Sequence, residues 1–400
     1  MRATRTMDAS FFSTKRPWSR YKDYLLESYL PPYLAKVNHL GKPILIVDCF
    51  AGRGRFEDGS PGSPLIIARA VQQWREQGVA ATARCVEADP GNFEVLQETL
   101  SEHAAYVEAV HGTFEDVLPG LESEAEKKTV FLYVDPYTVK GLRFDEMKRV
   151  YDQIHKADSS VELLMNFNVG IFMRWALAAV KRWDDLPDRA EFETMADDPD
   201  EHVERDELTS IAGGKYWITI AERSGPIFQE KLTQFLAEYA KRLARTFEYV
   251  ARFPVMEKLH HRVPKYVMIF ATRSPDGALL MNDNMCKARR QFVEEQLRKK
   301  YKGPTLFDVT PEGEVVEQEE LEAEVIRIVS VSDEPPSRWD VRLKLLLGGY
   351  FARLTQSDVN RAIASLLRSK RLRRYESTGR VNDATRLTVP KYGGTQRSLF

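Results

Sequence analysis

The chain has 400 residues, 43% of them hydrophobic and 29% charged, and its formal net charge is −1. This composition is typical of a soluble globular protein, and a chain of this length predicts two domains. The near-zero net charge excludes a uniformly basic protein that coats nucleic acid, so any basic surface must be local.

The cysteines and the apolar runs exclude further classes. Cys49, Cys85 and Cys286 are far apart and form no C-x-x-C pair, so we expect neither a metal site nor a disulfide framework. No segment approaches the roughly 18 consecutive apolar residues of a membrane span, and the first residues lack the apolar stretch of a signal peptide. The expected location is the cytoplasm, without a membrane partner.

In chain order, residues 1–40 are a basic and aromatic arm followed by a helix, which Pro31 and Pro32 are expected to bend or interrupt. Residues 41–300 then alternate between apolar runs and helical segments. The runs predict strands at residues 44–50, 83–88, 107–111, 129–134, 161–167, 249–253 and 266–271. Strands that are apolar on both faces and alternate with helices predict an α/β fold with a mostly parallel sheet. The last two strands lack a long helix between them, which predicts a late antiparallel strand.

Three further segments differ from this pattern. Residues 184–215 are acidic and contain prolines, which predicts a solvated insertion. Residues 301–318 have the composition of a linker. Residues 319–400 contain three helical segments and then two short strands. That order is typical of a winged-helix domain.

The first predicted strand ends in an acid and turns on two glycines, in the segment DCFAGRG at residues 48–54. Such glycines let the backbone approach a ligand closely, and the acid can hold an ammonium group. The third glycine of the dinucleotide motif G-x-G-x-x-G is absent, and there is no P-loop motif. We therefore expect Asp48, Phe50, Gly52 and Gly54 to bind S-adenosylmethionine. The alternative is a tight turn without a ligand.

Polar residues follow the next two strands. Glu87 ends the second strand, where a carboxylate can accept both ribose hydroxyls of an adenosine. Asp89 precedes a proline, where it can also cap the next helix, and Thr113 follows the third strand, near the expected adenine. These three residues complete the predicted cofactor-binding set. Rossmann-like methyltransferases have such a sheet, although other α/β folds share its strand pattern.

The segment Asp135-Pro136-Tyr137 follows the fourth strand, at the edge where open α/β sheets bind ligands. It resembles the (D/N)-P-P-(Y/F) motif of amino-methyltransferases, in which the acid accepts hydrogen bonds from an exocyclic amine and the ring stacks on a flipped base. The second proline is absent here. We predict Asp135, Pro136 and Tyr137 as catalytic residues, and Asn166 could line the same cleft. Alternatively, Asp135 merely ends a strand.

Together, these segments resemble the three-Cys-motif partner proteins over about residues 10–275. The matching residues are Phe11, Phe12, Lys15, Trp18-Ser19-x-x-Lys22, Asp48-x-Phe50-Ala51-Gly52-x-Gly54, Gly62-Ser63-Pro64, Glu87-x-Asp89 and Asp135-Pro136-Tyr137. The resemblance implies a Rossmann-like methyltransferase domain. It also implies a phage-related partner that bears a three-cysteine motif and looks like a radical-type iron–sulfur protein. Thr138 stands where members usually have glycine.

The C-terminal domain contains a basic segment. Residues 368–374 carry five basic side chains, and such a segment between a third helix and a wing suits phosphate contacts. The predicted nucleic-acid contacts are Arg361, Arg368, Lys370, Arg371, Arg373, Arg374 and Arg380. The alternative is that this domain docks a protein.

The sequence thus predicts methyl transfer from S-adenosylmethionine to an exocyclic amine of DNA or RNA. Two other functions stay open. One is a nucleic-acid adaptor that keeps the cofactor fold without catalysis. The other is a methyltransferase that acts on a protein or a small molecule.

Overall fold

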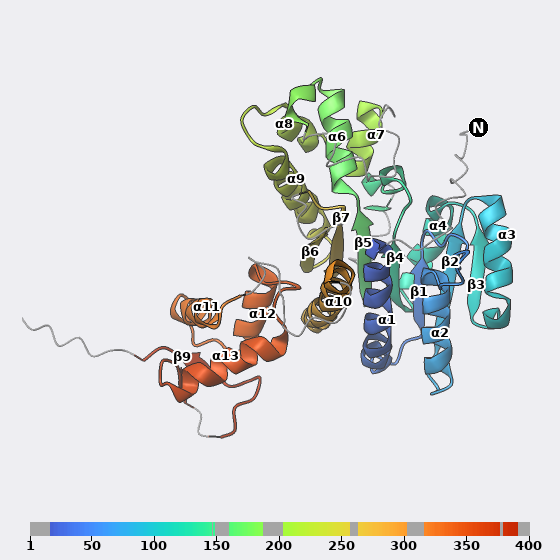
Figure 1. The fold of residues 1–400 in the computed structure, drawn as a ribbon. Helices are drawn as coiled ribbons and strands as arrows, with labels where there is room; N and C mark the ends of the chain where they lie inside the picture. The colour runs from blue at the N-terminus through green and yellow to red at the C-terminus, as the bar shows by residue number, and fades with distance from the viewer. Residues whose placement is uncertain are drawn as a thin grey trace, which may run out of the picture. The chain divides into compact units, whose positions relative to one another are not determined.

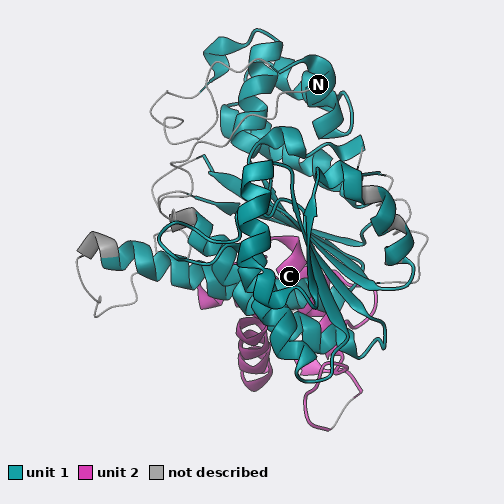
Figure 2. Ribbon diagram, turned by 90° about the vertical axis from the view of Figure 1, so that its right-hand side faces the viewer, with its two compact units in different colours: residues 1–304 teal, residues 305–400 magenta. Residues whose placement is uncertain are grey.

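The computed structural model describes residues 17–145, 147–148, 160–186, 203–256, 263–301, 316–376 and 379–390. The chain divides into two compact units, residues 1–304 and residues 305–400, which Figure 2 shows in different colours. The expected arm over residues 1–16 and most of the expected linker lie outside the described residues.

The first unit is built on a seven-stranded sheet in the order β3-β2-β1-β4-β5-β7-β6. Its strands are β1 Ile44–Asp48, β2 Ala81–Glu87, β3 Val107–His111, β4 Thr129–Val134, β5 Val161–Phe167, β6 Tyr249–Val255 and β7 Tyr266–Thr272. Strands β1 to β5 are parallel, and β7 is antiparallel to both β5 and β6. The predicted α/β class, with a mostly parallel sheet and a late antiparallel strand, is confirmed.

The helices of this unit alternate with the strands (Figure 1). They are α1 Pro17–Asn38, α2 Ser63–Arg75, α3 Pro90–Thr99, α4 Phe114–Ala125, α6 Val169–Ala179, α7 Arg205–Ala212, α8 Tyr216–Glu222, α9 Phe228–Leu243 and α10 Pro275–Tyr301. Short 3-10 turns are η2 Ser101–His103, η3 Val139–Gly141 and η4 Trp183–Asp185. Residues 149–159, which precede β5, lie outside the described residues.

Helices cover both faces of the sheet, because neighbouring strand residues point to opposite sides. On one face, Phe131 of β4 packs against Tyr29 of α1, with ring centroids 5.6 Å apart. Helix α1 contacts α2 and α10 on this face, in front of the sheet in Figure 1. On the other face, Leu132 of β4 shares a core with Phe114 of α4 and Phe235 of α9. Two apolar layers therefore fix the sheet.

Helix α1 corrects one expectation, because it continues through Pro31 and Pro32. Of the bend or interruption expected there, the interruption does not occur. Leu30 and Leu34 on either side of the prolines are fully buried. Packing against α2 and α10 thus outweighs the hydrogen bonds that the prolines remove.

The expected solvated insertion is also wrong in part. Residues 187–202 lie outside the described residues. In α7, however, Leu208, Ile211 and Ala212 are 0% exposed and belong to the hydrophobic core. The acids of this helix, Asp206 and Glu207, lie in its first turn, where they suit the helix dipole. This acidic segment therefore contains an amphipathic helix, which its composition did not predict.

The second unit has three helices, α11 Gln318–Ser330, α12 Arg338–Gly348 and α13 Gln356–Arg368. Two short strands follow, β8 Arg373–Arg374 and β9 Leu387–Thr388, and they pair antiparallel. Ser337, just before α12, forms an isolated bridge with Arg386 beside β9. The elements thus follow the expected order of three helices and a hairpin. No helix within the described ranges is long and apolar enough to cross a membrane.

Glu162 of β5 joins α1 to the sheet. Its side chain is 2% exposed and accepts hydrogen bonds from Tyr29 Oη and from Thr272 Oγ1, the latter at 3.3 Å. Burial raises the pKa of Glu162 to about 7, although both hydrogen bonds act in the opposite direction. The folded protein therefore keeps the Glu162 proton to a higher pH than the unfolded chain does.

We predict that this proton makes stability depend on pH. Its contribution is fully present below the ordinary glutamate pKa of 4.5 and is lost as the pH rises through about 7. Urea unfolding across this window should therefore show a shallower decline for Glu162→Gln than for the wild type. Glu57→Gln, which changes an exposed carboxylate, should match the wild type. Parallel pH profiles for Glu162→Gln and the wild type would contradict the assignment.

Candidate active site

The carboxyl ends of β1, β2 and β4 meet at one edge of the sheet. Asp48 ends β1 and lies in register with Cys85 of β2 and Tyr133 of β4. Glu87 ends β2, and Asp135 follows the last residue of β4. The three predicted acids therefore share the edge at which open α/β sheets bind ligands.

Asp48 is a buried carboxylate with one oxygen that is not hydrogen-bonded. It is 0% exposed, and Oδ1 accepts a hydrogen bond from the Phe50 backbone N–H at 3.3 Å. Burial raises the pKa of Asp48 to about 7, against the effect of hydrogen bonds from Ser63 and Phe50. Oδ2 is buried and finds no partner among the described residues. Because such an atom is costly to bury, it marks a place where a cationic or N–H group would fit.

Glu87 connects the two loops beside it. Its side chain accepts hydrogen bonds from Gly52 N–H at 2.8 Å through Oε2 and from Asp89 N–H at 2.7 Å through Oε1. Burial raises the pKa of Glu87, whereas these backbone hydrogen bonds lower it. An ionised carboxylate has about four acceptor sites, so Glu87 keeps acceptor capacity for a further donor. Gly52 takes a positive φ of 63° in this arrangement.

Gly54 has a different role from Gly52. Its φ is +75°, and an added Cβ would lie 3.0 Å from Thr99 Cγ2 and 3.2 Å from Leu96 Cδ1. Thr99 Oγ1 also donates a hydrogen bond to the Arg53 carbonyl at 3.1 Å. The turn therefore packs directly on α3, and Gly54 is needed for that close approach.

Two other predicted cofactor residues cap helices. Asp89 accepts a hydrogen bond from Asn92 N–H at 2.8 Å at the start of α3. Thr113 begins α4, where its N–H and hydroxyl donate to the Asp116 carboxylate at 2.9 and 2.8 Å. Both positions lie next to the carboxyl edge, but their side chains are already used to begin helices.

The predicted catalytic segment is packed against the glycine turn. Phe50 lies against Phe114, with ring centroids 6.1 Å apart, and Pro136 and Tyr137 are half-buried. A Cβ added to Gly141 would lie 2.9 Å from Phe50 Cε1 and 3.1 Å from Pro136 Cβ. Gly141 thus allows η3 to close over Phe50 beside the end of β4.

Asp135 is held by three donors. Lys22 Nζ lies 2.5 Å from Oδ2, and Tyr133 Oη donates to the same oxygen at 3.2 Å. Asn166 Nδ2 donates to Oδ1 at 2.7 Å, while its own Oδ1 is buried and finds no partner in the described part of the chain. An ionised carboxylate accepts about four hydrogen bonds. Asp135 therefore has little acceptor capacity left for an exocyclic amine.

Sequence reasoning gave no role to Lys22 or Ser63. Both residues stand in segments that carry the family resemblance, and this resemblance is the feature of the sequence that could have identified them. Lys22 is 113 residues from its partner Asp135, and Ser63 reaches Asp48 from the first turn of α2. Neither contact follows from local spacing.

The predicted nucleic-acid contacts of the second unit divide into two groups. Arg361 and Arg368 are exposed on one face of α13, beside the uncharged Ser357 and Ala364, and Arg361 forms an ion pair with Asp358 of the same helix. Lys370, Arg371, Arg373, Arg374 and Arg380 are exposed at and after the end of this helix. Together they form one basic strip that includes α13 and β8.

Arg371 belongs to the second group. Its Nη1 donates to Glu322 Oε2 of α11 at 2.7 Å, and the Glu322 side chain is only 10% exposed. This ion pair joins the start of the hairpin to α11. Arg371 thus has a structural partner that its predicted phosphate contact would have to replace.

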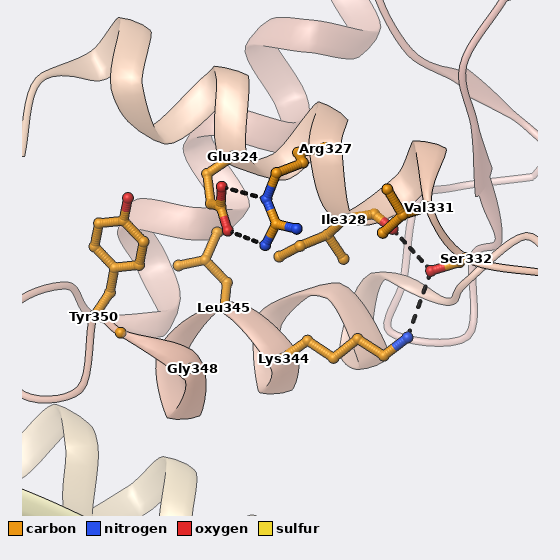
Figure 3. Close-up of a pocket in the computed structure, with 10 residues that line it drawn as sticks. Glu324, Arg327, Ile328, Val331, Ser332, Lys344, Leu345, Gly348 and Tyr350 are labelled. Carbon is orange, nitrogen blue, oxygen red and sulfur yellow. Dashed lines mark hydrogen bonds and ion pairs between the residues drawn. The ribbon is translucent and has the colours of Figure 1, made fainter.

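A separate pocket of 340 Å³ lies between α11 and α12 (Figure 3). Arg327 lines it and forms two hydrogen bonds with Glu324, at 2.5 and 2.7 Å. Lys344 donates to Ser332 at 3.4 Å. The pocket contains none of the predicted site residues. Nowhere in the described ranges do three or more His, Cys, Asp or Glu side chains gather as metal ligands.

Comparisons with known proteins give structural similarities only. No family model matches the chain. No curated protein matches it. A Legionella pneumophila protein of the family model DUF519 aligns with 70% of this chain and 92% of its own, at 10% identity and a TM-score of 0.38.

Two shorter alignments involve methyltransferases. A putative methyltransferase from Escherichia coli covers 36% of this chain and 69% of its own, at 20% identity and a TM-score of 0.23. An RNA methyltransferase from Salinibacter ruber, in complex with S-adenosyl-L-homocysteine, covers 34% and 74%, at 17% identity and a TM-score of 0.20.

Replacement of Gly54 tests the packing of the turn. Gly59→Ala is a matched control, since Gly59 also has a positive φ, +81°, but no atom within 4 Å of an added Cβ. Gly59→Ala should lower the free energy of unfolding by about 1–2 kcal/mol through backbone strain. Gly54→Ala should cost about 1–3 kcal/mol more, because its methyl group meets α3. Equal losses in urea unfolding would show that the contact with α3 is unimportant.

Proposed function

We propose that the first unit binds S-adenosylmethionine and transfers its methyl group to nucleic acid. The observation that carries this proposal is the buried Asp48 Oδ2 atom without a partner among the described residues, beside the Gly52 turn. The ammonium group of the methionine portion would satisfy that oxygen. The cofactor supplies a methyl group on a positively charged sulfur, and Asp48 adds a compensating negative charge.

Glu87 supports the same assignment. Its two oxygens accept the backbone N–H groups of Gly52 and Asp89 and keep acceptor capacity for a ligand. They would receive the two ribose hydroxyls of the adenosine portion. Asp48 and Glu87 end neighbouring strands β1 and β2, so the two ends of one extended ligand would have separate anchors along the sheet edge.

The nucleic-acid part of the proposal rests on the second unit. We assign it as a winged helix whose α13 presents the basic strip defined above. The apolar face of α13, with Val359, Ile363 and Leu366, is buried, so its charged face is available to a ligand. An exposed helix of this kind, followed by a basic hairpin, suits phosphate contacts in a groove. The iron–sulfur-type partner implied by the family resemblance would act with this assembly.

A non-catalytic adaptor is the second candidate. It is favoured by the Asp135 carboxylate, which Lys22, Tyr133 and Asn166 already occupy. An adaptor would bind nucleic acid without transferring a methyl group. Cofactor binding is the property that separates the two candidates first.

Calorimetric titration of S-adenosylmethionine should give saturable binding to the wild type. Asp48→Asn should weaken binding by at least about 30-fold, because loss of one partner of a buried charge pair costs about 2–5 kcal/mol. Glu162→Gln is the matched control, since Glu162 is also a buried carboxyl with a pKa near 7 but lies on β5 away from the edge. It should bind normally. A folded wild type that binds no cofactor would overturn the enzyme proposal and favour the adaptor.

Salt-dependent anisotropy with a fluorescent duplex tests the basic strip. The logarithm of the affinity falls as the logarithm of the salt concentration rises. If Arg361 and Arg368 each contact a phosphate, Arg361→Ala combined with Arg368→Ala should make this slope less steep by about 2. Arg327→Ala removes another exposed arginine of the same unit, which is paired with Glu324 as Arg361 is with Asp358 but lies outside the basic strip, and should leave the slope unchanged. An unchanged slope in the double variant would argue for protein docking instead.

A further inference from the structure

We propose that Lys22 is a catalytic residue and that the methyl acceptor is a ribose hydroxyl of RNA. This inference rests on the proposed function, and it concerns the atom that receives the methyl group. It starts from the contact between Lys22 and Asp135 at the carboxyl end of β4.

Helix α1 carries Lys22 to the carboxyl edge and holds it there. Tyr29, two turns further along, is buried and donates to Glu162, and Lys36 near the end of the helix lies 3.3 Å from Asp276. These contacts fix the helix along the sheet. The Lys22 ammonium lies 2.5 Å from Asp135 Oδ2 and 5.5 Å from the centre of the Tyr266 ring.

The surroundings of Lys22 leave it reachable. Its side chain is 15% exposed and that of Asp135 is 16% exposed, so the pair is neither sealed in the core nor freely solvated. A partly desolvated ion pair at the edge of the sheet can contact a bound substrate. In such a place its charges are screened less than on the open surface.

The pair suits a hydroxyl better than an exocyclic amine. An exocyclic amine is oriented by two groups that accept its N–H bonds. Asp135 already receives Lys22, Tyr133 and Asn166, so among the described residues the buried Asn166 Oδ1 is the single acceptor that this cluster fully retains. A hydroxyl acceptor instead needs a nearby base for its proton as the new bond forms. Lys22 is the group of this cluster that can act as that base after losing one proton.

The proton balance closes within the pair. The proton between Lys22 and Asp135 moves onto the carboxylate, which leaves an uncharged amine. The hydroxyl oxygen then bonds to the methyl carbon while the carbon–sulfur bond breaks with its electron pair on sulfur, and the hydroxyl proton passes to the Lys22 amine. The carboxyl proton finally returns to water. The result is a methyl ether and a neutral thioether, with the Lys22–Asp135 ion pair restored.

This chemistry selects RNA among nucleic acids. Every internal nucleotide of RNA carries a 2′-hydroxyl, and DNA has none. The basic strip on α13 and β8 contacts phosphate in either polymer, so discrimination would come from the acceptor site of the first unit.

The test uses the full-length protein, labelled S-adenosylmethionine, and random-sequence RNA and DNA oligonucleotides as probes. Lys22→Arg keeps the positive charge, but a guanidinium cannot be deprotonated in a protein. Lys36→Arg is the matched control, because Lys36 is on the same helix and is also paired with an aspartate. Each variant is measured for cofactor affinity, unfolding temperature, RNA retention and methyl transfer, and digested products are analysed by mass spectrometry.

We expect ribose-methylated RNA from the wild type and no transfer to DNA. Lys22→Arg should lose about 100-fold or more of the transfer rate, while its cofactor affinity, unfolding temperature and RNA retention stay unchanged. Lys36→Arg should behave as the wild type. Methyl on a base nitrogen would overturn the inference. It would instead assign Asp135 and Asn166 the role of orienting an exocyclic amine by accepting its hydrogen bonds.

Other results would also overturn the inference. Full activity of Lys22→Arg would exclude a base at this position. Transfer to DNA, or cofactor binding without any transfer to RNA, would exclude the ribose acceptor while leaving the cofactor site intact. A folded wild type that binds no cofactor would overturn the proposed function itself.

Discussion

The Glu87 carboxylate is the interaction on which the candidate site depends. It accepts one backbone N–H from the loop after β1 and one from the loop after β2, at Gly52 and Asp89. By holding both loops it sets the turn at Gly52, and Asp89 in turn begins α3, on which Gly54 packs. The free-energy cost of burying the Glu87 carboxylate is thereby offset by two backbone hydrogen bonds, which also order both loops.

Helix α1 makes the second connection between fold and site. One end of it supplies Lys22 to the carboxyl edge, and its middle donates from Tyr29 to Glu162 inside the core. An element that lies before the first strand in sequence therefore completes the end of the fourth strand. The helix has both a packing role and a chemical role, and the two are separated by two turns.

The sequence predicted the sheet well because its signals are local. Apolar runs such as residues 129–134 identify buried strands, and the acids at 48 and 87 mark where such strands stop. The contact between Lys22 and Asp135 spans 113 residues and depends on how α1 packs, so no spacing rule contained it. For α7 the acidic composition predicted a solvated segment. Asp206 and Glu207 lie only in its first turn, however, and the helix has a buried apolar face. Likewise, the continuous helix through Pro31 depends on tertiary packing that no local rule includes.

The raised pKa of Asp48, about 7, has a thermodynamic consequence for any cation that binds there. Near neutral pH the free carboxyl group is partly protonated, whereas a cation at Oδ2 favours the ionised form. Binding would therefore expel protons into the solvent. The observed heat would then change with the ionisation enthalpy of the buffer, and the number of protons released could be counted by repeating the measurement in several buffers.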